Sequence, residues 1–388
     1  MRHGRLRLVL SLGVLVAAVT GCASVGASTT SAVPDERSPI AAVPGCERAW
    51  TDPADDSPTR TVARCAPGTP APQPLSHPAT VVVSIPVRLE YAAPLLLADS
   101  LGEFAKENIT IRYVGLPSYD AIPQLSQGQI DAAVAGYELA LFNAERLGLD
   151  VEAVMGNYFP PDAGDYSVPQ TGLWCRRSSF SNPADPDPAE TQDMKWGIAT
   201  GKGTVSFYYS VAELARRVPD FDPHRVRIEA LMPNEAAIAL GNGAVDCASL
   251  IDPLWVDFVT SDYVQMATQT PGEPLGMTLF GKNLIDDSPA VGDAFVRAVV
   301  RTINTYLAGD YHSDPKVMDA LAVAMNMPVE KIARTPSLRF DWELRSGTPD
   351  RVQQLFLDLH VISGYEHLVP EEELIDRSFT EHAVGRTN

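Results

Sequence analysis

The stretch from Gly197 to Thr204 reads GIATGKGT and contains the residue types of a phosphate-binding loop, but not their spacing. Such a loop has four residues between its first glycine and a Gly-Lys pair, with Ser or Thr directly after the lysine. Here three residues separate Gly197 from Gly201, and Gly203 stands between Lys202 and Thr204. What remains is a glycine-rich turn leading into a helix N-terminus, where backbone amides can bind a small polar ligand.

Other patterns of catalysis or metal binding are missing from the sequence. The seven histidines are scattered, and neither an HExxH nor a GxSxG motif occurs. The five cysteines show no CxxC spacing. His360 and His367 are close in sequence, but we interpret them as solvated surface. The sequence therefore predicts no catalytic residue, no metal and no cofactor.

Polar and aromatic residues do gather directly after the predicted strands. Open α/β sheets bind ligands outside the carboxyl ends of their strands, and aromatic walls with a few polar groups are typical of a small-molecule pocket. Asp120 and Glu138 have a second interpretation, because the macrodipole alone favours carboxylates in the first turn of a helix. The candidate ligand-binding residues are Arg88, Glu90, Tyr91, Ser118, Tyr119, Gly136, Tyr137, Glu138, Tyr158, Trp174, Gly203, Thr204 and Asp252.

The elements that must position these residues occur twice. Gln127-GQIDAAVAG and Asn242-GAVDCASL repeat one pattern, in which a glycine closes a helix and an apolar residue, Asp and small residues follow. Each phrase ends a β-α-β-α-β series. In the first series we predict strands at 80–87, 109–116 and 130–136 and helices at 94–104 and 118–128. In the second we predict strands at 195–200, 226–232 and 244–251 and helices at 206–217 and 234–243.

This alternation predicts an α/β fold of two lobes, each a mostly parallel sheet flanked by helices. Further helices are expected at 137–148, 288–307, 314–326 and 348–364, and the last three should return to cover the first lobe. Asp252-Pro253 should start another helix, with proline at its first position.

The charge balance limits the choice of partner. The 388 residues contain 49 Asp and Glu against 30 Lys and Arg, a formal net charge of −19. Such a surface repels phosphate backbones, so nucleic-acid binding is not expected.

The N-terminus has the pattern of an export signal. Met1-RHGRLR is basic, Leu8-VLSLGVLVAAVT is apolar, and Gly21-Cys22 follows. Val19-Thr20-Gly21-Cys22 resembles the lipobox of bacterial lipoproteins, which predicts a signal peptide at 1–21 and lipidation of Cys22. The alternative is an ordinary signal with a chance cysteine. Residues 23–78 contain ten prolines and no periodicity, which predicts an extended stalk over 22–78.

Export makes the other cysteines interpretable, since disulfides persist in oxidising compartments. Cys46 and Cys65 are the natural local pair, and their bridge would contribute about 3 kcal/mol in the chain-entropy picture. Cys175 and Cys247 could pair or remain two buried thiols.

Two segments resemble the type II solute-binding proteins of ABC importers. They are Tyr91-AAPLLLADSLGEFAKENITIRYVGLPSYDAIPQLSQGQIDAAVAG and Pro233-NEAAIALGNGAVDCASLIDPLW, which resemble matching parts of the two lobes. The nearest group binds nitrate, sulfonates, taurine or pyrimidine precursors of thiamine. Related thiamine-precursor synthases contain a run of cysteines that is missing here, which favours binding over synthesis.

The resemblance implies lobe 1 at 79–172 plus 277–388, lobe 2 at 173–276, and crossover strands near Gly172–Arg176 and Met277–Gly281. It implies a monomeric lipoprotein, extracytoplasmic and anchored to the cell membrane, that delivers a small solute to the permease and ATPase subunits of an importer. The alternative is an enzyme on the same fold that acts on a pyrimidine-type metabolite. Helix N-termini and Arg88 favour an anion as ligand, whereas the acidic residues and tyrosines favour a neutral or amino-bearing heterocycle.

Overall fold

The computed structural model describes residues 35–41, 69–159, 169–269, 273, 276–362, 365 and 367–385. Cys22, Cys46 and Cys65 lie outside these residues, so the lipidation and the local disulfide remain predictions. Two five-stranded sheets organise the chain from Pro34 onward. We call each sheet with its helices a lobe.

The lobe 1 sheet has the strand order β2-β1-β3-β11-β4. β1 pairs in parallel with β2 and β3, whereas β11 is antiparallel to both β3 and β4. The strands are β1 (Ala79–Ser84), β2 (Ile109–Val114), β3 (Ala132–Gly136), β4 (Val151–Gly156) and β11 (Gly276–Gly281). β11 therefore returns from lobe 2 and is inserted between β3 and β4 of the lobe 1 sheet.

The lobe 2 sheet repeats this arrangement in the order β8-β7-β9-β6-β10. β7 is parallel to β8 and β9, and β6 is antiparallel to β9 and β10. The strands are β6 (Gly172–Arg176), β7 (Lys195–Ala199), β8 (Arg227–Leu231), β9 (Cys247–Leu250) and β10 (Tyr263–Thr268). The expected α/β class is confirmed, and in each sheet the strand next to the third one is antiparallel.

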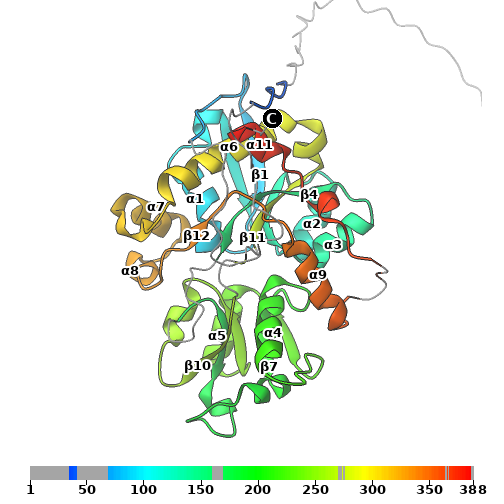
Figure 1. Cartoon of the computed structure of the whole chain (residues 1–388). Helices are drawn as coiled ribbons and strands as arrows, with labels where there is room; N and C mark the ends of the chain where they lie inside the picture. Colours follow the sequence, from blue (N-terminus) through cyan, green and yellow to red (C-terminus); the bar gives the residue numbers. More distant parts are fainter. Residues whose placement is uncertain are drawn as a thin grey trace, which may run out of the picture. The chain divides into compact units, whose positions relative to one another are not determined.

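Helices flank both sheets (Figure 1). Lobe 1 contains α1 (Ala93–Ser100), α2 (Ser118–Ser126), α3 (Leu139–Arg146), α6 (Pro289–Tyr306), α7 (Pro315–Met325), α8 (Val329–Ile332), α10 (Glu371–Leu374) and α11 (Ser378–Val384). Lobe 2 contains α4 (Val205–Arg217) and α5 (Pro233–Asn242). A short pair of strands, β5 (Tyr158–Phe159) and β12 (Arg339–Phe340), lies outside the two sheets.

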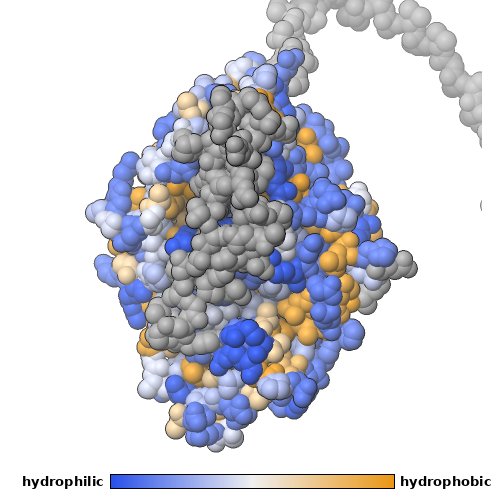
Figure 2. Space-filling view, in the orientation of Figure 1, coloured by the Kyte–Doolittle hydropathy of each residue, from blue (hydrophilic) through white to orange (hydrophobic). Residues whose placement is uncertain are grey.

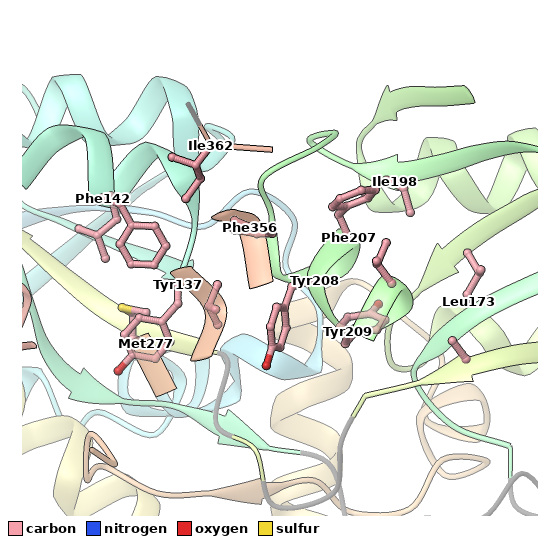
Figure 3. Close-up of a cluster of buried hydrophobic side chains, with 14 of the residues drawn as sticks. Tyr137, Phe142, Leu173, Ile198, Phe207, Tyr208, Tyr209, Met277, Phe356 and Ile362 are labelled. Carbon is pink, nitrogen blue, oxygen red and sulfur yellow. The ribbon is translucent and has the colours of Figure 1, made fainter. Parts of the chain in front are cut away.

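Helix α9 (Thr348–Asp358) departs from the expectation that the C-terminal helices cover lobe 1 alone. It packs against α4 of lobe 2, where the rings of Tyr208 and Phe356 meet edge to face with centroids 6.3 Å apart. Figure 3 shows Phe356 and Tyr208 between the lobe 1 side chains Tyr137 and Phe142 and the lobe 2 core. On the face in Figure 2, hydrophobic residues gather where Figure 1 places α9. One hydrophobic cluster thus extends through both lobes.

Three other expectations need correction. β10 was not predicted, because only its second half is buried and its residues alternate weakly. The helix expected to run to residue 364 ends at Asp358. The segment after Asp252 is a 3-10 helix, Leu254–Phe258, and Pro253 stands before it rather than inside it.

Each of the two repeated aspartates stands just before the third strand of its β-α-β-α-β series and binds the first strand of that series. Asp131 thus joins β3 to β1, and Asp246 joins β9 to β7. Asp131 accepts a hydrogen bond from the backbone amide of Val82 at 2.6 Å, and its own amide donates to the Val82 carbonyl. Asp246 has the same relation to Lys195 in lobe 2, with a carboxylate distance of 2.9 Å. The matching contacts explain why the phrase occurs twice, because it sets the register at which the third strand begins.

Part of the expected stalk is packed onto lobe 1. The Arg37 guanidinium binds Asp293 at 2.7 Å and lies over the ring of Phe379. Leu75 is buried in the lobe 1 core, and Arg297 donates to the Gln73 carbonyl at 2.8 Å. The proline-rich composition did not indicate these contacts, since two of the partners, Asp293 and Arg297, lie more than 200 residues away in sequence.

Cys175 and Cys247 form a disulfide, which decides between the two interpretations left open by the sequence. They are direct cross-strand partners in β6 and β9, so the bridge ties the crossover strand to its neighbour. Among the described residues, no helix has both the length and the apolar character needed to cross a bilayer.

We predict that Asp131→Ala and Asp246→Ala each lower the free energy of unfolding by about 1–3 kcal/mol, because each removes a hydrogen bond from a backbone amide to a carboxylate. Urea denaturation should measure the loss. Asp185→Ala, at an exposed loop position, is the matched control and should change stability little. A loss no larger than that of the control would contradict the proposed joining role.

Candidate functional site

A pocket of about 90 Å³ lies between the two lobes. A buried water needs roughly 10–15 Å³ of such space, so the pocket has room for a compact solute. Its walls come from the carboxyl ends of β1 and β3 in lobe 1 and of β7 and β9 in lobe 2. This is where open α/β sheets bind ligands.

Six of the residues predicted from the sequence line this pocket: Tyr91, Ser118, Gly136, Glu138, Tyr158 and Thr204. They come from both lobes and from segments more than 100 residues apart. The structure thus brings together about half of the candidate set at one cavity.

The glycine that starts β11 makes room for an aromatic ring. Because β11 is antiparallel to β3, its first residue, Gly276, lies opposite the last residue of β3, Gly136. A Cβ atom at Gly276 would lie 2.8 Å from Cδ1 and 2.9 Å from Cε1 of Tyr158. The Tyr158 ring can occupy its position only because this strand starts with glycine.

Glu138 is the carboxylate of the pocket. It precedes α3 as the N-cap residue, but its side chain accepts no capping hydrogen bond. Instead its carboxylate accepts from the Ser118 hydroxyl and the Gly136 amide. Burial raises the pKa of Glu138 to about 7, and these two hydrogen bonds only partly oppose the shift. Glu138 thus lies at the N-terminus of α3, as the macrodipole interpretation expects, and also in the lining of the pocket.

Tyrosine rings form the apolar wall. The centroids of Tyr91 and Tyr158 lie 6.2 Å apart, with the ring planes at 50°. The Tyr91 hydroxyl donates to the Val87 carbonyl at 2.7 Å. Burial raises the pKa of both phenols far above the usual value, so both stay neutral. The wall offers ring faces and edges rather than charge.

The glycine-rich turn supplies the lobe 2 side. Thr200, Gly201 and Gly203 have positive φ of 58°, 91° and 82°, which bends the chain sharply between β7 and α4. The Thr204 side chain caps α4 by accepting from the Phe207 amide. The Gly203 carbonyl accepts from the Leu139 amide at 2.8 Å, so the turn bonds directly to lobe 1. The two lobes are therefore in contact around the pocket.

Seven candidates lie outside the lining, and four of these are Arg88, Tyr119, Tyr137 and Gly203. The Arg88 side chain is exposed, with its guanidinium 4.8 Å from the centroid of the Tyr113 ring. The Tyr119 side chain is 53% exposed. Tyr137 is packed in the core beside Phe142 (Figure 3). Gly203 contributes its carbonyl bond to lobe 1, as described above, but is not itself part of the lining.

Glu90 and its partners form a buried cluster inside lobe 1. The carboxylate accepts from the Tyr311 hydroxyl and lies 2.5 Å from Nε2 of His312. Burial lowers the pKa of His312, but the hydrogen bond and charge of Glu90 outweigh it, so the pKa lies above its usual value. These contacts occupy Glu90 within the lobe.

Trp174 and Asp252 lie where the chain enters lobe 2. Asp252 accepts from the Thr171 hydroxyl and from Nε1 of Trp255 at 2.8 Å. The rings of Trp174 and Trp255 are parallel, with centroids 6.2 Å apart. Burial and the charge of Glu90 raise the pKa of Asp252 to about 6. Asp252 thus links the end of β9 to the residue before β6.

Sequence reasoning missed several lining residues: Thr200, Ser206, Pro233, Ile251 and Gly276. Two signals could have found some of them. Ser206 belongs to the first turn of the helix after the glycine-rich turn, and Gly276 starts the crossover strand. Within the described part of the chain, no group of three or more His, Cys, Asp or Glu side chains could hold a metal ion.

No protein-family model and no curated protein sequence matches the chain. Solved structures do match it. The alkanesulfonate-binding protein SsuA from Xanthomonas axonopodis pv. citri, bound to MOPS, has a TM-score of 0.58 and 17% identity, covering 76% of this chain and 97% of its own. The periplasmic nitrate-binding protein NrtA from Synechocystis PCC 6803 has a TM-score of 0.60 and 12% identity, with 79% and 88% covered.

The chain has the periplasmic-binding-protein fold. The fold predicted from the two resembling segments is thereby confirmed. A cysteine-to-serine mutant of DSZB in complex with biphenyl-2-sulfinic acid is also similar, with a TM-score of 0.52 and 12% identity over 78% of this chain and 98% of that one. At these identities the comparisons establish the fold alone.

Within this fold, Glu138 should make stability depend on pH. Its pKa in the folded state is about 7, above the ordinary 4.5. The folded protein therefore keeps this proton to a higher pH than the unfolded chain does. As a result, the free energy of unfolding falls as the pH rises from about 4.5 to about 7. We predict that Glu138→Gln removes this fall and stabilises the protein by up to about 3 kcal/mol at pH 8 relative to pH 4. Thermal melts across this range test it.

The exposed Glu330 gives the control, since Glu330→Gln should keep the wild-type slope. Identical pH profiles for Glu138→Gln and the wild type would show that the carboxyl is not desolvated.

Proposed function

We propose that the protein is the membrane-anchored substrate-binding lipoprotein of an ABC import system. It captures a small solute between its lobes and delivers it to permease and ATPase subunits, as a monomer outside the cytoplasm. The observation that carries this proposal is the pocket itself, which is lined from both lobes and lies where both crossover strands begin.

Capture by closure of the lobes follows from this position. The pocket is complete only when lobe 2 residues such as Thr204 face lobe 1 residues such as Glu138. A solute that contacts both sides stabilises the closed arrangement by its differential affinity for that state. The bond from the Leu139 amide to the Gly203 carbonyl would break on opening.

The solute is a heteroaromatic, such as a pyrimidine precursor of thiamine, or an anion of the sulfonate or nitrate type. Two proteins of the same fold are named for alkanesulfonate and nitrate binding. The tyrosine wall and Glu138 instead support the heteroaromatic.

The alternative function is an enzyme on the same fold that acts on a pyrimidine-type metabolite. Glu138 supports it, because a carboxyl with a pKa of about 7 suits general acid–base chemistry. The basic and apolar N-terminal stretch and the lipobox-like run up to Cys22 support the receptor. Conversion of a bound pyrimidine by the purified protein would decide for the enzyme.

Thermal melting should identify the solute class. We predict that one compound in a screen of sulfonates, nitrate, thiamine precursors, flavins and purines raises the melting temperature, because binding to the folded state alone stabilises it. Gly276→Ala should weaken that binding about tenfold, since the new Cβ displaces the Tyr158 ring.

Gly241→Ala is the matched control, because a Cβ there has its nearest neighbour at 4.0 Å. Its affinity should equal that of the wild type. A screen without any shift would overturn the receptor proposal, and full affinity in Gly276→Ala would place the site elsewhere.

Membrane attachment depends on Cys22 in this proposal. We predict that Cys22→Ser releases the protein from the membrane fraction of the producing cells, because the thiol that would receive the lipid is lost. Fractionation and immunoblotting measure the shift. Unchanged membrane retention would show that something other than a lipid on Cys22 anchors the protein.

A further inference from the structure

The pocket contains a buried carboxylate, Glu138, for which no positively charged partner is seen. Glu138 is 7% exposed and lines the cavity. Its two protein partners, the Ser118 hydroxyl and the Gly136 amide, are neutral. An ionised carboxylate has room for about four hydrogen bonds, so part of its acceptor capacity is available to a ligand.

Four of the hydroxyl groups that line the pocket already donate to the protein. Tyr91 donates to the Val87 carbonyl, Thr204 to the Gly201 carbonyl at 2.9 Å and Thr200 to the Ala199 carbonyl at 2.8 Å. Ser118 donates to Glu138. Each hydroxyl has a single hydrogen but two lone pairs. These four hydroxyls can therefore accept hydrogen bonds from a ligand, but they have no hydrogen left to give. The hydroxyls of Tyr158 and Ser206 also line the pocket.

Positive charge is also missing from the walls. None of the described lining residues is Lys, Arg or His. Arg88, the cation nearest in sequence to the lobe 1 wall, is exposed beside Tyr113. A bound oxyanion would face the Glu138 carboxylate in a desolvated space, where repulsion between like charges is strong.

Helix N-termini are the one feature that favours an anion. α3 begins directly after Glu138, and α4 begins at Val205 in the lining. Their partial positive charge attracts carboxylates and oxyanions. At α3, however, the protein supplies that anion itself, since Glu138 directly precedes this helix. The Leu139 amide also donates to the Gly203 carbonyl rather than to the pocket.

We infer that the pocket selects a solute by its hydrogen-bond donors, namely a protonated amine, an amidine or the amino group of a flat heterocycle, and excludes oxyanions. This inference rests on the proposed receptor function and names its substrate class. The donor group binds Glu138, and the flat part lies along the Tyr91 and Tyr158 rings.

Four probes test this with the full-length protein in isothermal titration calorimetry: benzamidine, 4-aminopyrimidine, benzenesulfonate and nitrate. Benzamidine and benzenesulfonate share a ring and differ in the sign of the charge. We expect the two donor-bearing probes to bind at least tenfold more tightly than the two anions. Glu138→Gln should weaken benzamidine binding at least tenfold, because it removes the charge and keeps the shape.

Glu145→Gln is the matched control, since Glu145 lies on the same helix outside the lining, and it should bind benzamidine like the wild type. Tighter binding of benzenesulfonate or nitrate would overturn the inference and leave the receptor proposal standing. Failure of both donor-bearing probes would also overturn it, while the wider screen separately decides the receptor proposal. The probes are ranked on the wild-type protein, so this outcome does not depend on whether any variant folds.

Discussion

The chain must pass between two sheets twice, and each passage ends in a strand inserted antiparallel beside the third strand of a sheet. This constraint fixes the place of the pocket. An antiparallel neighbour starts where its partner ends, so Gly276 lies opposite Gly136 and Gly172 opposite Leu250. The carboxyl ends of the third strands and the starts of the crossover strands must therefore coincide. In the proposed capture by lobe closure, a solute bound there would contact the segments at which the chain crosses between the lobes.

The same constraint concentrates buried acids near the crossovers. Burial raises the pKa of Glu138 to about 7 and that of Asp252 to about 6, although hydrogen bonds oppose both shifts. Keeping these groups lowers the stability of the protein at neutral pH. Asp252 is held by the Thr171 hydroxyl and the Trp255 indole. Glu138 keeps acceptor capacity, and a ligand that donates to it offsets part of the cost of its burial.

The sequence predicted the fold well, because glycines, caps and apolar runs are local signals. The repeated phrase located β3 and β9, and the aspartates in it make equivalent contacts. The residues of the site were harder to predict. The end of a strand indicates which residues lie near the pocket, but not which way each side chain points. Tyr137 follows β3 but is packed in the core, whereas Tyr158 reaches the pocket over Gly276. The partner of Arg88, the Tyr113 ring, lies on a neighbouring strand, and no local pattern could reveal that pairing.

The two copies of the repeat differ most in the residues that follow their common phrase, at the ends of β3 and β9. In both copies a carboxylate follows two residues after the end of the strand: Glu138 after β3 in lobe 1 and Asp252 after β9 in lobe 2. Asp252 binds Thr171 and so fixes the start of the crossover strand β6. Glu138 instead accepts from the Ser118 hydroxyl and the Gly136 amide of its own lobe. Glu138 lines the pocket and Asp252 does not. If the proposed receptor function holds, the two acids of the repeated unit have different roles, because Asp252 supports a crossover strand while Glu138 faces the solute.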